Sequence, residues 1–257
     1  MELGNRDLFD LSGRVAFVTG AAQGLGQAAA IGLARYGADV VCVDIRAESC
    51  AQTRDRVCAY GRRALAFGCD ITDEPAVRAV VDEAVTALGR IDVLFNAAGI
   101  TRRVASTDIR PEDWRRVVDV DLVGTFLCCQ AVGRQMLSQG NGSIINVSSI
   151  AGLGGIGRGN TAYSASKAGV IGLTRELAVE WAPTVRVNAL APVQFRTPFI
   201  QAILSDEELT RRMVAKIPMG RMGEPEEIVG PTVFLASEAS SLVTGHVLSV
   251  DGGYMAQ

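Results

Sequence analysis

The sequence predicts an α/β fold: a single domain spanning residues 1–257, with helices on both faces of a doubly wound, seven-stranded parallel sheet. Short runs rich in β-branched residues alternate with longer segments of helical spacing, and that alternation is typical of parallel sheets with helical crossovers. No internal repeat or linker divides the 257 residues, a length near the upper size of one domain. The first apolar run ends in a glycine-rich turn of the kind that opens a crossover helix.

Seven apolar runs are expected to form the strands, and five longer segments the helices between them. The predicted strands contain, in order, RVAFVTG, ADVVCVD, ALAFGCD, IDVLFNAAG, GSIINVSS, VRVNALAP and GHVLSVDGG. The predicted helices cover Gly24 to Tyr36, Pro75 to Leu88, Pro111 to Ser138, Ala162 to Trp181 and Pro225 to Leu235. Ligands of such sheets bind outside the carboxyl ends of the strands, so we expect the functional site there.

One long segment, residues 195–222, departs from this alternation. It contains ILSDEELTRRMVAKI, which predicts one amphipathic helix with acidic residues first and basic residues after them. Extra chain after the end of a strand is well placed to cover a ligand. We therefore expect a small substrate lid over residues 195–222.

Charge and cysteine content exclude several classes of function. The chain has 25 basic and 28 acidic residues, so it lacks the positive excess of a nucleic-acid-binding protein. Its six cysteines form no Cys-x-x-Cys pair and it has one histidine, so no metal site is expected. The start, MELGNRDLFDL, lacks the pattern of a secretory signal, and no apolar run reaches membrane-spanning length. We expect a cytoplasmic protein with reduced thiols and no nucleic-acid or membrane partner.

The stretch VTGAAQGLGQ, residues 18–27, places three glycines between a predicted strand and a predicted helix. Gly20 permits a tight turn, Gly24 permits close approach of a pyrophosphate, and Gly26 permits close packing of the helix on the sheet. The helix N-terminus supplies unpaired N–H donors for an anion. No Lys-Ser/Thr pair of a triphosphate loop follows, so the stretch predicts a dinucleotide site of the Rossmann type.

Asp44 ends the second predicted strand, where a carboxylate can hydrogen-bond the ribose hydroxyls of an adenosine. A 2′-phosphate beside it would meet a repulsion of about 4 kcal/mol, for unit charges about 4 Å apart at an effective dielectric of about 20. We therefore expect NAD as the cofactor rather than NADP. Arg46 leaves the alternative open, because its guanidinium could partly neutralise that repulsion.

Several motifs together resemble the short-chain dehydrogenase/reductase family, over essentially the whole chain. They are Thr19-Gly20-x-x-x-Gly24-x-Gly26, CDITD, NAAG, NVSSIAG, YSASK, VNALAP and VDGGY. The resemblance implies that one set of residues binds the dinucleotide: Gly20, Gln23, Gly24, Leu25, Gly26, Asp44, Ile45, Asp70, Ile71, Asn96, Ala97, Ala98, Gly99, Tyr163, Lys167, Pro192, Phe195 and Thr197. It places Asp70 and Ile71 beside the adenine and the last three residues at the nicotinamide end. It also implies a homotetramer built through the long helices and the C-terminal strand.

Tyr163 and Lys167 are four residues apart on a predicted helix, so both side chains lie on one face. A phenol has a pKa of about 10, and lowering it to near neutrality takes about 4 kcal/mol of preference for the phenolate. Burial acts against this, whereas the Lys167 ammonium, aided by an oxidised nicotinamide, has the required sign. We expect Tyr163 to accept a proton from an alcohol, or to donate one to a ketone. Ser149 best matches the family's serine, which would orient the substrate oxygen.

Two positions depart from the family's pattern. Asp121 stands where an asparagine usually takes part in a proton relay, and we include it among the candidate catalytic residues. Aspartate is tolerated if the relay depends on the backbone carbonyl, but its carboxylate can also pair with Lys167 and weaken the hold of that ammonium on the phenolate. Val193 stands where a glycine is common, and its Cβ restricts positive φ.

Arg102 and Arg103 follow the fourth predicted strand, and with Ser149 they are the candidate substrate-binding residues. In this pair the chain resembles the family's gluconate 5-dehydrogenases and keto-deoxygluconate dehydrogenases, which often carry a similar Arg-Arg. A guanidinium can bind a carboxylate in a bidentate fork. The sequence therefore favours hydride transfer between NAD(H) and a secondary alcohol or ketone of a polyol or sugar acid. A solvated arginine pair is an equally open interpretation. A 3-oxoacyl-thioester reductase and a weakly catalytic NAD-binding sensor or scaffold are the alternative functions.

Overall fold

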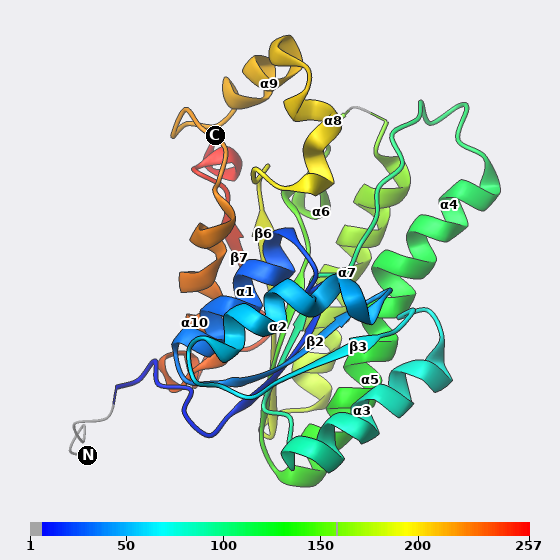
Figure 1. Ribbon diagram of the computed structural model, residues 1–257. Coiled ribbons are helices and arrows are strands. Elements are labelled where there is room, and N and C mark those ends of the chain that lie inside the picture. The colour runs from blue at the N-terminus through cyan, green and yellow to red at the C-terminus, as the bar shows by residue number, and fades with distance from the viewer. Residues whose placement is uncertain (1–6, 158) are drawn as a thin grey trace.

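A computed structural model describes residues 7–157 and 159–257, with a twisted sheet at the centre of the molecule (Figure 1). Across these residues the sheet has seven strands, all parallel, in the order β3-β2-β1-β4-β5-β6-β7. The strands are β1 (Val15–Thr19), β2 (Asp39–Asp44), β3 (Ala64–Gly68), β4 (Val93–Asn96), β5 (Gly142–Val147), β6 (Val185–Pro192) and β7 (Val247–Val250). Each lies in a run that the sequence predicts as a strand, so the predicted sheet is confirmed.

Helices cover both faces of the sheet (Figure 1). One face carries α1, α2 and α10, and the other carries α3, α4, α5 and α7. The helices are α1 (Gly24–Arg35), α2 (Ala51–Cys58), α3 (Glu74–Leu88), α4 (Pro111–Val118), α5 (Thr125–Gln139), α6 (Ile150–Leu153), α7 (Thr161–Glu180), α8 (Gln201–Leu204), α9 (Glu207–Val214) and α10 (Val229–Ala236). Shorter helical turns are η1 (Ala47–Cys50), η3 (Pro198–Ile200), η4 (Pro225–Ile228), η5 (Glu238–Ser240) and η6 (Tyr254–Ala256), and a π-helical segment, η2 (Asp119–Gly124), joins α4 to α5.

Strand β1 shows why the apolar runs are continuous. Val15 and Phe17 pack into the core beneath α3 and α5, whereas Ala16 and Val18 pack into the core beneath α1 and α10. All four side chains are at most 1% exposed. Because successive side chains of a strand point to opposite faces, a strand covered on both faces must be apolar at every position. Each large aliphatic or aromatic side chain buried this way contributes about 1.5–3 kcal/mol to folding.

The strand order places the functional site. The chain proceeds from β1 through β2 to β3 at one edge and then returns to β4 on the other side of β1. The crossovers after β1 and β4 therefore leave in opposite directions, and Thr19 and Asn96 are paired at the ends of these two strands. A crevice at such a switch point is where ligands of doubly wound sheets bind.

Three features differ from the sequence prediction. Helix α2 was not expected, because it is short and polar and buries only Thr53 and Val57. The helix expected over Pro111 to Ser138 is divided by η2, a π-helical segment with i→i+5 hydrogen bonds that the helical composition of this stretch did not reveal. The lid contains two short helices rather than one: α8 ends at Leu204, and Asp206 caps α9 by accepting the N–H of Leu209 at 2.9 Å.

Two absences hold for the described parts of the chain. Within them no helix is long and apolar enough to cross a membrane. The same residues contain no cluster of three histidine, cysteine or acidic side chains that could hold a metal ion. Residues 1–6, which begin the stretch used to argue against a secretory signal, lie outside the described residues.

Candidate active site

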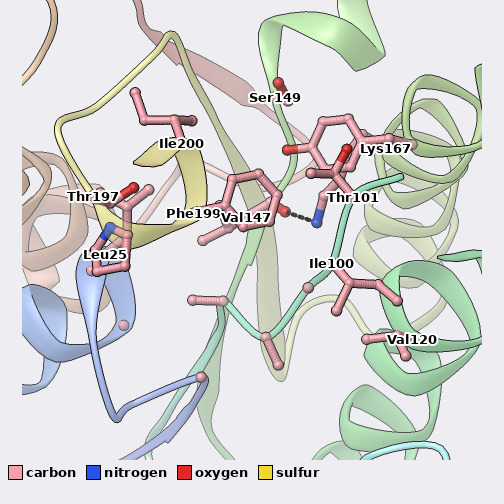
Figure 2. A pocket seen from close by; sticks show the side chains of 18 of the residues that line it. Leu25, Ile100, Thr101, Val120, Val147, Ser149, Lys167, Thr197, Phe199 and Ile200 are labelled. Atoms are coloured by element: carbon pink, nitrogen blue, oxygen red, sulfur yellow. Dashed lines mark hydrogen bonds between the residues drawn. The ribbon is translucent and has the colours of Figure 1, made fainter. Parts of the chain in front are cut away.

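A cavity of about 750 Å³ opens at the carboxyl ends of the central strands, where the sequence predicts the ligand site (Figure 2). Its wall comes from the ends of β1, β2, β4, β5 and β6 and from the lid. Most predicted site residues lie on this wall: Gly20, Gln23, Gly24, Leu25, Gly26, Asp44, Ile45, Asp70, Ile71, Ala97, Ala98, Gly99, Arg103, Ser149, Tyr163, Lys167, Pro192, Phe195 and Thr197. Asn96, Arg102 and Asp121 are not on the wall.

The glycine loop leaves no room for side chains at two of its positions. Gly20 has a φ of +65°, and an added Cβ would lie 2.8 Å from the backbone N of Ala98. At Gly26 an added Cβ would lie 2.1 Å from the carbonyl oxygen of Gly20. Gln23, the residue before α1, makes no side-chain capping hydrogen bond, so the first turn of this helix presents its N–H groups without a protein cap. Such a backbone cradle at a helix N-terminus fits a pyrophosphate.

The far end of the cavity carries two carboxylates. Asp44 accepts the N–H of Ala22 at 3.1 Å and that of Ile45 at 2.8 Å, which fixes its carboxylate at the end of β2. Asp70 accepts the N–H and the hydroxyl of Thr72 at 2.9 and 2.7 Å, and these hydrogen bonds hold the pKa of Asp70 below its ordinary value. Both positions fit the adenosine half of a dinucleotide.

Asn96 lies beneath the groove rather than on its wall. Its side chain is buried and donates to Asn146 Oδ1 at 2.9 Å and to Cys129 Sγ at 3.3 Å. Asn146 in turn donates to Thr174 at 3.1 Å. This buried polar chain links β4, β5 and α7, so Asn96 supports the groove without touching its contents.

Tyr163, Lys167 and Ser149 meet at the end of β5. Lys167 is 4% exposed, its Nζ donates to the Val147 carbonyl at 3.0 Å, and it lies 5.6 Å from the centre of the Tyr163 ring (Figure 2). Ser149 caps α6 by accepting the N–H of Ala151 at 3.1 Å, and its hydroxyl acts to lower the pKa of the Tyr163 phenol. The end of strand β5 and helix α7 therefore hold a phenol, an ammonium and a hydroxyl together at the cavity wall.

The ammonium alone does not lower the pKa of the phenol. Burial raises the pKa of Tyr163 above its ordinary value, and the charge of Asp121 acts in the same direction. Lys167, the hydrogen bond with Ser149 and the charge of Arg103 act in the opposite direction. Desolvation is the largest of these effects, so Lys167 does not offset it by itself.

Asp121 is buried behind the cavity wall, in η2, and is 0% exposed. Its Oδ1 accepts the N–H of Ile100 at 2.7 Å, and its Oδ2 lies 3.4 Å from Lys167 Nζ. Burial raises the pKa of Asp121 above its ordinary value, and Lys167 opposes that change. The Asp121 carbonyl accepts the hydroxyl of Thr125 at 2.9 Å. The pairing with Lys167 that the sequence left open is therefore present.

The structure separates the two neighbouring arginines. Arg102 is 58% exposed at its side chain and lies 3.8 Å from Asp113 on α4, away from the cavity. Arg103 lines the cavity, and its charge acts on Tyr163. Of the two candidates for a substrate carboxylate, only Arg103 is in a position to meet a ligand.

Several wall residues were missed by the sequence analysis. Phe199 in the lid lines the cavity, and its ring centre lies 5.9 Å from that of Tyr163. Asn160 also lines the cavity, and its side-chain oxygen accepts the hydroxyl of Thr101 at 3.3 Å. The expected lid was the signal for Phe199, whereas nothing in the local pattern marked Asn160. Val193 borders the cavity but is 9% exposed, and its N–H donates to the Val250 carbonyl at 3.1 Å, as in a continued strand. The valine is therefore accommodated by core packing.

Residues 20–255 match the family model described as "Enoyl-(Acyl carrier protein) reductase". The 2-dehydro-3-deoxy-D-gluconate 5-dehydrogenase of Dickeya dadantii (strain 3937) is 40% identical over 251 residues, which are 97% of this chain and 98% of that protein. The 3-oxoacyl-(acyl-carrier-protein) reductase FabG of Thermotoga maritima is 41% identical over 244 residues, 95% of this chain and 98% of that protein. The crystal structure of a gluconate 5-dehydrogenase from Burkholderia cenocepacia J2315, in complex with NADP and tartrate, has a TM-score of 0.94 at 36% identity and covers 98% of each chain.

These similarities extend from the glycine loop to the last strand. They agree with the backbone cradle at Gly20 and Gly26 and with the paired Tyr163 and Lys167 at the cavity wall. The chain is an NAD(P)-dependent oxidoreductase that acts on CH–OH groups, and it belongs to the short-chain dehydrogenase/reductase family.

Proposed function

We propose that the chain transfers a hydride between NAD(H) and a secondary alcohol or ketone of a sugar acid or related polyol. The observation that carries this proposal is the meeting of Tyr163, Lys167 and Ser149 in a cavity that Arg103 also lines. The activities of the Dickeya and Burkholderia relatives, both on sugar acids, support the substrate class.

The protein's part in the reaction is proton transfer and orientation. When bound, the nicotinamide supplies or accepts the hydride. Ser149 donates a hydrogen bond to the substrate oxygen and holds it near the phenol. In the oxidative direction the Tyr163 phenolate takes the hydroxyl proton as the hydride leaves carbon, and in the reductive direction the phenol returns that proton to the carbonyl oxygen. Lys167 holds positive charge beside the phenolate and is itself fixed by the Val147 carbonyl.

Arg103 is the proposed anchor for a substrate carboxylate. Its guanidinium is on the cavity wall and close enough to act on the charge of Tyr163, so a bound carboxylate would lie near the reacting carbon. Arg102 instead forms an ion pair with Asp113, at 3.8 Å, and is not proposed to bind the substrate. Ser149 completes the proposed substrate contacts.

Within NAD(P), we propose NAD as the preferred cofactor. The fixed carboxylate of Asp44 lies where an adenosine ribose would bind, and a phosphate there would be repelled. Arg46 is exposed and does not belong to the cavity wall, which weakens its case as a partner for that phosphate. The NADP bound to the Burkholderia enzyme is the observation that favours the other cofactor.

A turnover panel tests the function. Gluconate with NAD⁺, 5-keto-gluconate with NADH, and an acetoacetyl thioester with NADH and with NADPH are followed by nicotinamide absorbance. We expect the sugar acids to react with NAD(H), and Tyr163→Phe to lower kcat by at least about a hundredfold with little change in NADH affinity. Reaction of the thioester alone with NADPH would favour the reductase activity of the Thermotoga relative. Tight NADH binding with no turnover of any compound would favour a sensor or scaffold.

We also propose a homotetramer in the cytoplasm. Apolar side chains are exposed on the helices expected to form its interfaces: Val123 in η2, Phe126 and Leu137 in α5 and Val179 in α7. All six cysteines are free, in agreement with a reducing compartment.

A further inference from the structure

We propose that Asp121 is a positioning residue of this oxidoreductase: its carboxylate shares the Lys167 ammonium with Tyr163 and so moves the working pH range of the enzyme upward. The inference rests on the proposed role of Tyr163 as the proton acceptor. It adds a second buried partner for the ammonium, and that partner carries a negative charge.

The geometry fixes Asp121 in this role. Its Oδ1 is held by the Ile100 N–H at 2.7 Å, so the carboxylate cannot rotate away without breaking a buried hydrogen bond. Its Oδ2 lies 3.4 Å from Lys167 Nζ, an ion-pair distance, and accepts no hydrogen bond from the described residues. With 0% of Asp121 exposed, the charge of Oδ2 has the ammonium as its compensation.

The Lys167 ammonium therefore interacts with three groups. Its Nζ donates to the Val147 carbonyl, pairs with Asp121 and faces the ring of Tyr163 at 5.6 Å. An ammonium that is already neutralised by a carboxylate attracts a developing phenolate less than a free ammonium does. The pair with Asp121 thus reduces the help that Lys167 gives to Tyr163.

Asp121 is the negatively charged side chain that acts on the Tyr163 phenol, and the other charged side chains that act on it are positive. The charged side chains that act on the phenol are Lys167 from α7, Asp121 from η2 and Arg103 from the segment after β4. Lys167 and Arg103 favour the phenolate, and Asp121 is the group of this set that disfavours it. Further charged groups line the same cavity on α4, on η2 and at the adenosine end: Glu112, Arg115, Arg116, Asp119, Asp44 and Asp70.

The Asp121→Asn variant separates the effect of the carboxylate's charge from the effect of its shape. An amide oxygen still accepts the Ile100 N–H, but the negative charge beside Lys167 is gone. Alcohol oxidation needs the phenolate, so its rate rises as pH passes the pKa of Tyr163. Removing a nearby negative charge lowers that pKa, and the acidic limb of the oxidation profile moves to lower pH. Ketone reduction needs the phenol, so its alkaline limb moves in the same direction.

The first experiment measures pH profiles of kcat/KM for the wild-type holoenzyme, Asp121→Asn and Asp121→Ala. We expect both variants to move the acidic limb of oxidation down by about one pH unit, because both remove the charge although only alanine also removes the hydrogen bond to Ile100. Asp82→Asn removes an exposed charge on α3 and is expected to leave the profile unchanged. An unshifted profile in Asp121→Asn would mean that Asp121 carries a proton in the working range, which overturns the proposal.

The second experiment follows tyrosinate absorbance with NAD⁺ bound and does not need turnover. The chain has four tyrosines, so each spectrum is compared with that of the same protein carrying Tyr163→Phe, which isolates Tyr163. We expect Tyr163 to ionise at lower pH in Asp121→Asn than in the wild type. Equal ionisation in both proteins overturns the charge sharing even if the enzyme is active. A clear shift in a protein that turns over no sugar acid would instead contradict the proposed function alone.

Discussion

A single methyl group added at Gly26 should disrupt the glycine loop. An ideal Cβ there lies 2.1 Å from the carbonyl oxygen of Gly20, and the obstacle is backbone rather than a flexible side chain. The loop or the start of α1 must therefore move. We expect Gly26→Ala to weaken NADH binding at least about tenfold, which corresponds to about 1.4 kcal/mol. Fluorescence titration with NADH measures the loss.

Gly172 in α7 provides a matched control. An added Cβ there meets nothing within 4 Å, and the residue is exposed. Gly172→Ala should leave NADH binding unchanged and stabilise the fold by up to about 1 kcal/mol, because alanine has the better helix propensity. Equal weakening of NADH binding by both variants would show that Gly26 has no special place in the cofactor site.

The sequence alone could assign some site residues and not others, because it does not show toward which neighbour each side chain points. Ser149 was singled out by its motif, and the structure indeed separates it from Ser148, whose hydroxyl donates to the Lys167 carbonyl at 2.8 Å. Arg102 and Arg103 could not be told apart. The direction of Arg102 depends on Asp113, which a different element supplies. For two adjacent residues in a loop, the local sequence does not determine which partner each side chain contacts.

At the level of elements, Glu227 holds the start of η4 and α10 in place. Its carboxylate accepts the N–H of Glu224 at 2.8 Å and both terminal nitrogens of Arg221, at 2.6 and 2.7 Å. These contacts lower the pKa of Glu227 from its ordinary 4.5 to about 2. A lowered pKa contributes stability above the unfolded value of 4.5, and this contribution is lost as pH falls toward about 2.

We therefore expect Glu227→Gln to be less stable than the wild type near neutral pH, by up to about 1 kcal/mol for so exposed a pair. The difference should shrink as the pH falls below about 4.5. Urea unfolding at several pH values measures it. Glu226→Gln removes the same charge one residue away and should leave the stability nearly unchanged. A Glu227→Gln deficit that stays constant down to about pH 3 would contradict the ionic origin of the effect.

Elements that bury a long apolar face were predictable, and short polar ones were not. Helix α3 buries Val77, Val80, Val81, Ala84 and Leu88, a spacing that the sequence displays directly. Helix α2 buries only Thr53 and Val57, so its place is determined by packing against α1 and β3 rather than by its own pattern. The π-helical η2 was equally hidden, although it determines where the Asp121 carboxylate lies.

At the level of the whole molecule, the parallel sheet was predictable because its strands are buried on both faces and are therefore apolar at successive positions. Strand β7, at the edge, is only partly buried, yet its apolar run was still predicted as a strand. The cavity volume and the lid contacts were beyond prediction, since they depend on how segments far apart in the chain approach one another. The contact of Phe199 with Tyr163 is such a case.

The proposed homotetramer is a property of the whole molecule, and Val179 is the residue to test it. Its side chain is 81% exposed on α7, one of the helices through which the proposed tetramer is built. In a tetramer built through α5 and α7 we expect Val179→Asp to bury a charge and to yield smaller species in light scattering. Tyr60→Asp, which replaces an exposed aromatic residue after α2, should leave the assembly intact. A wild-type protein that is monomeric in light scattering would contradict the proposed tetramer. A Val179→Asp protein that is still tetrameric would show that Val179 lies outside the interfaces.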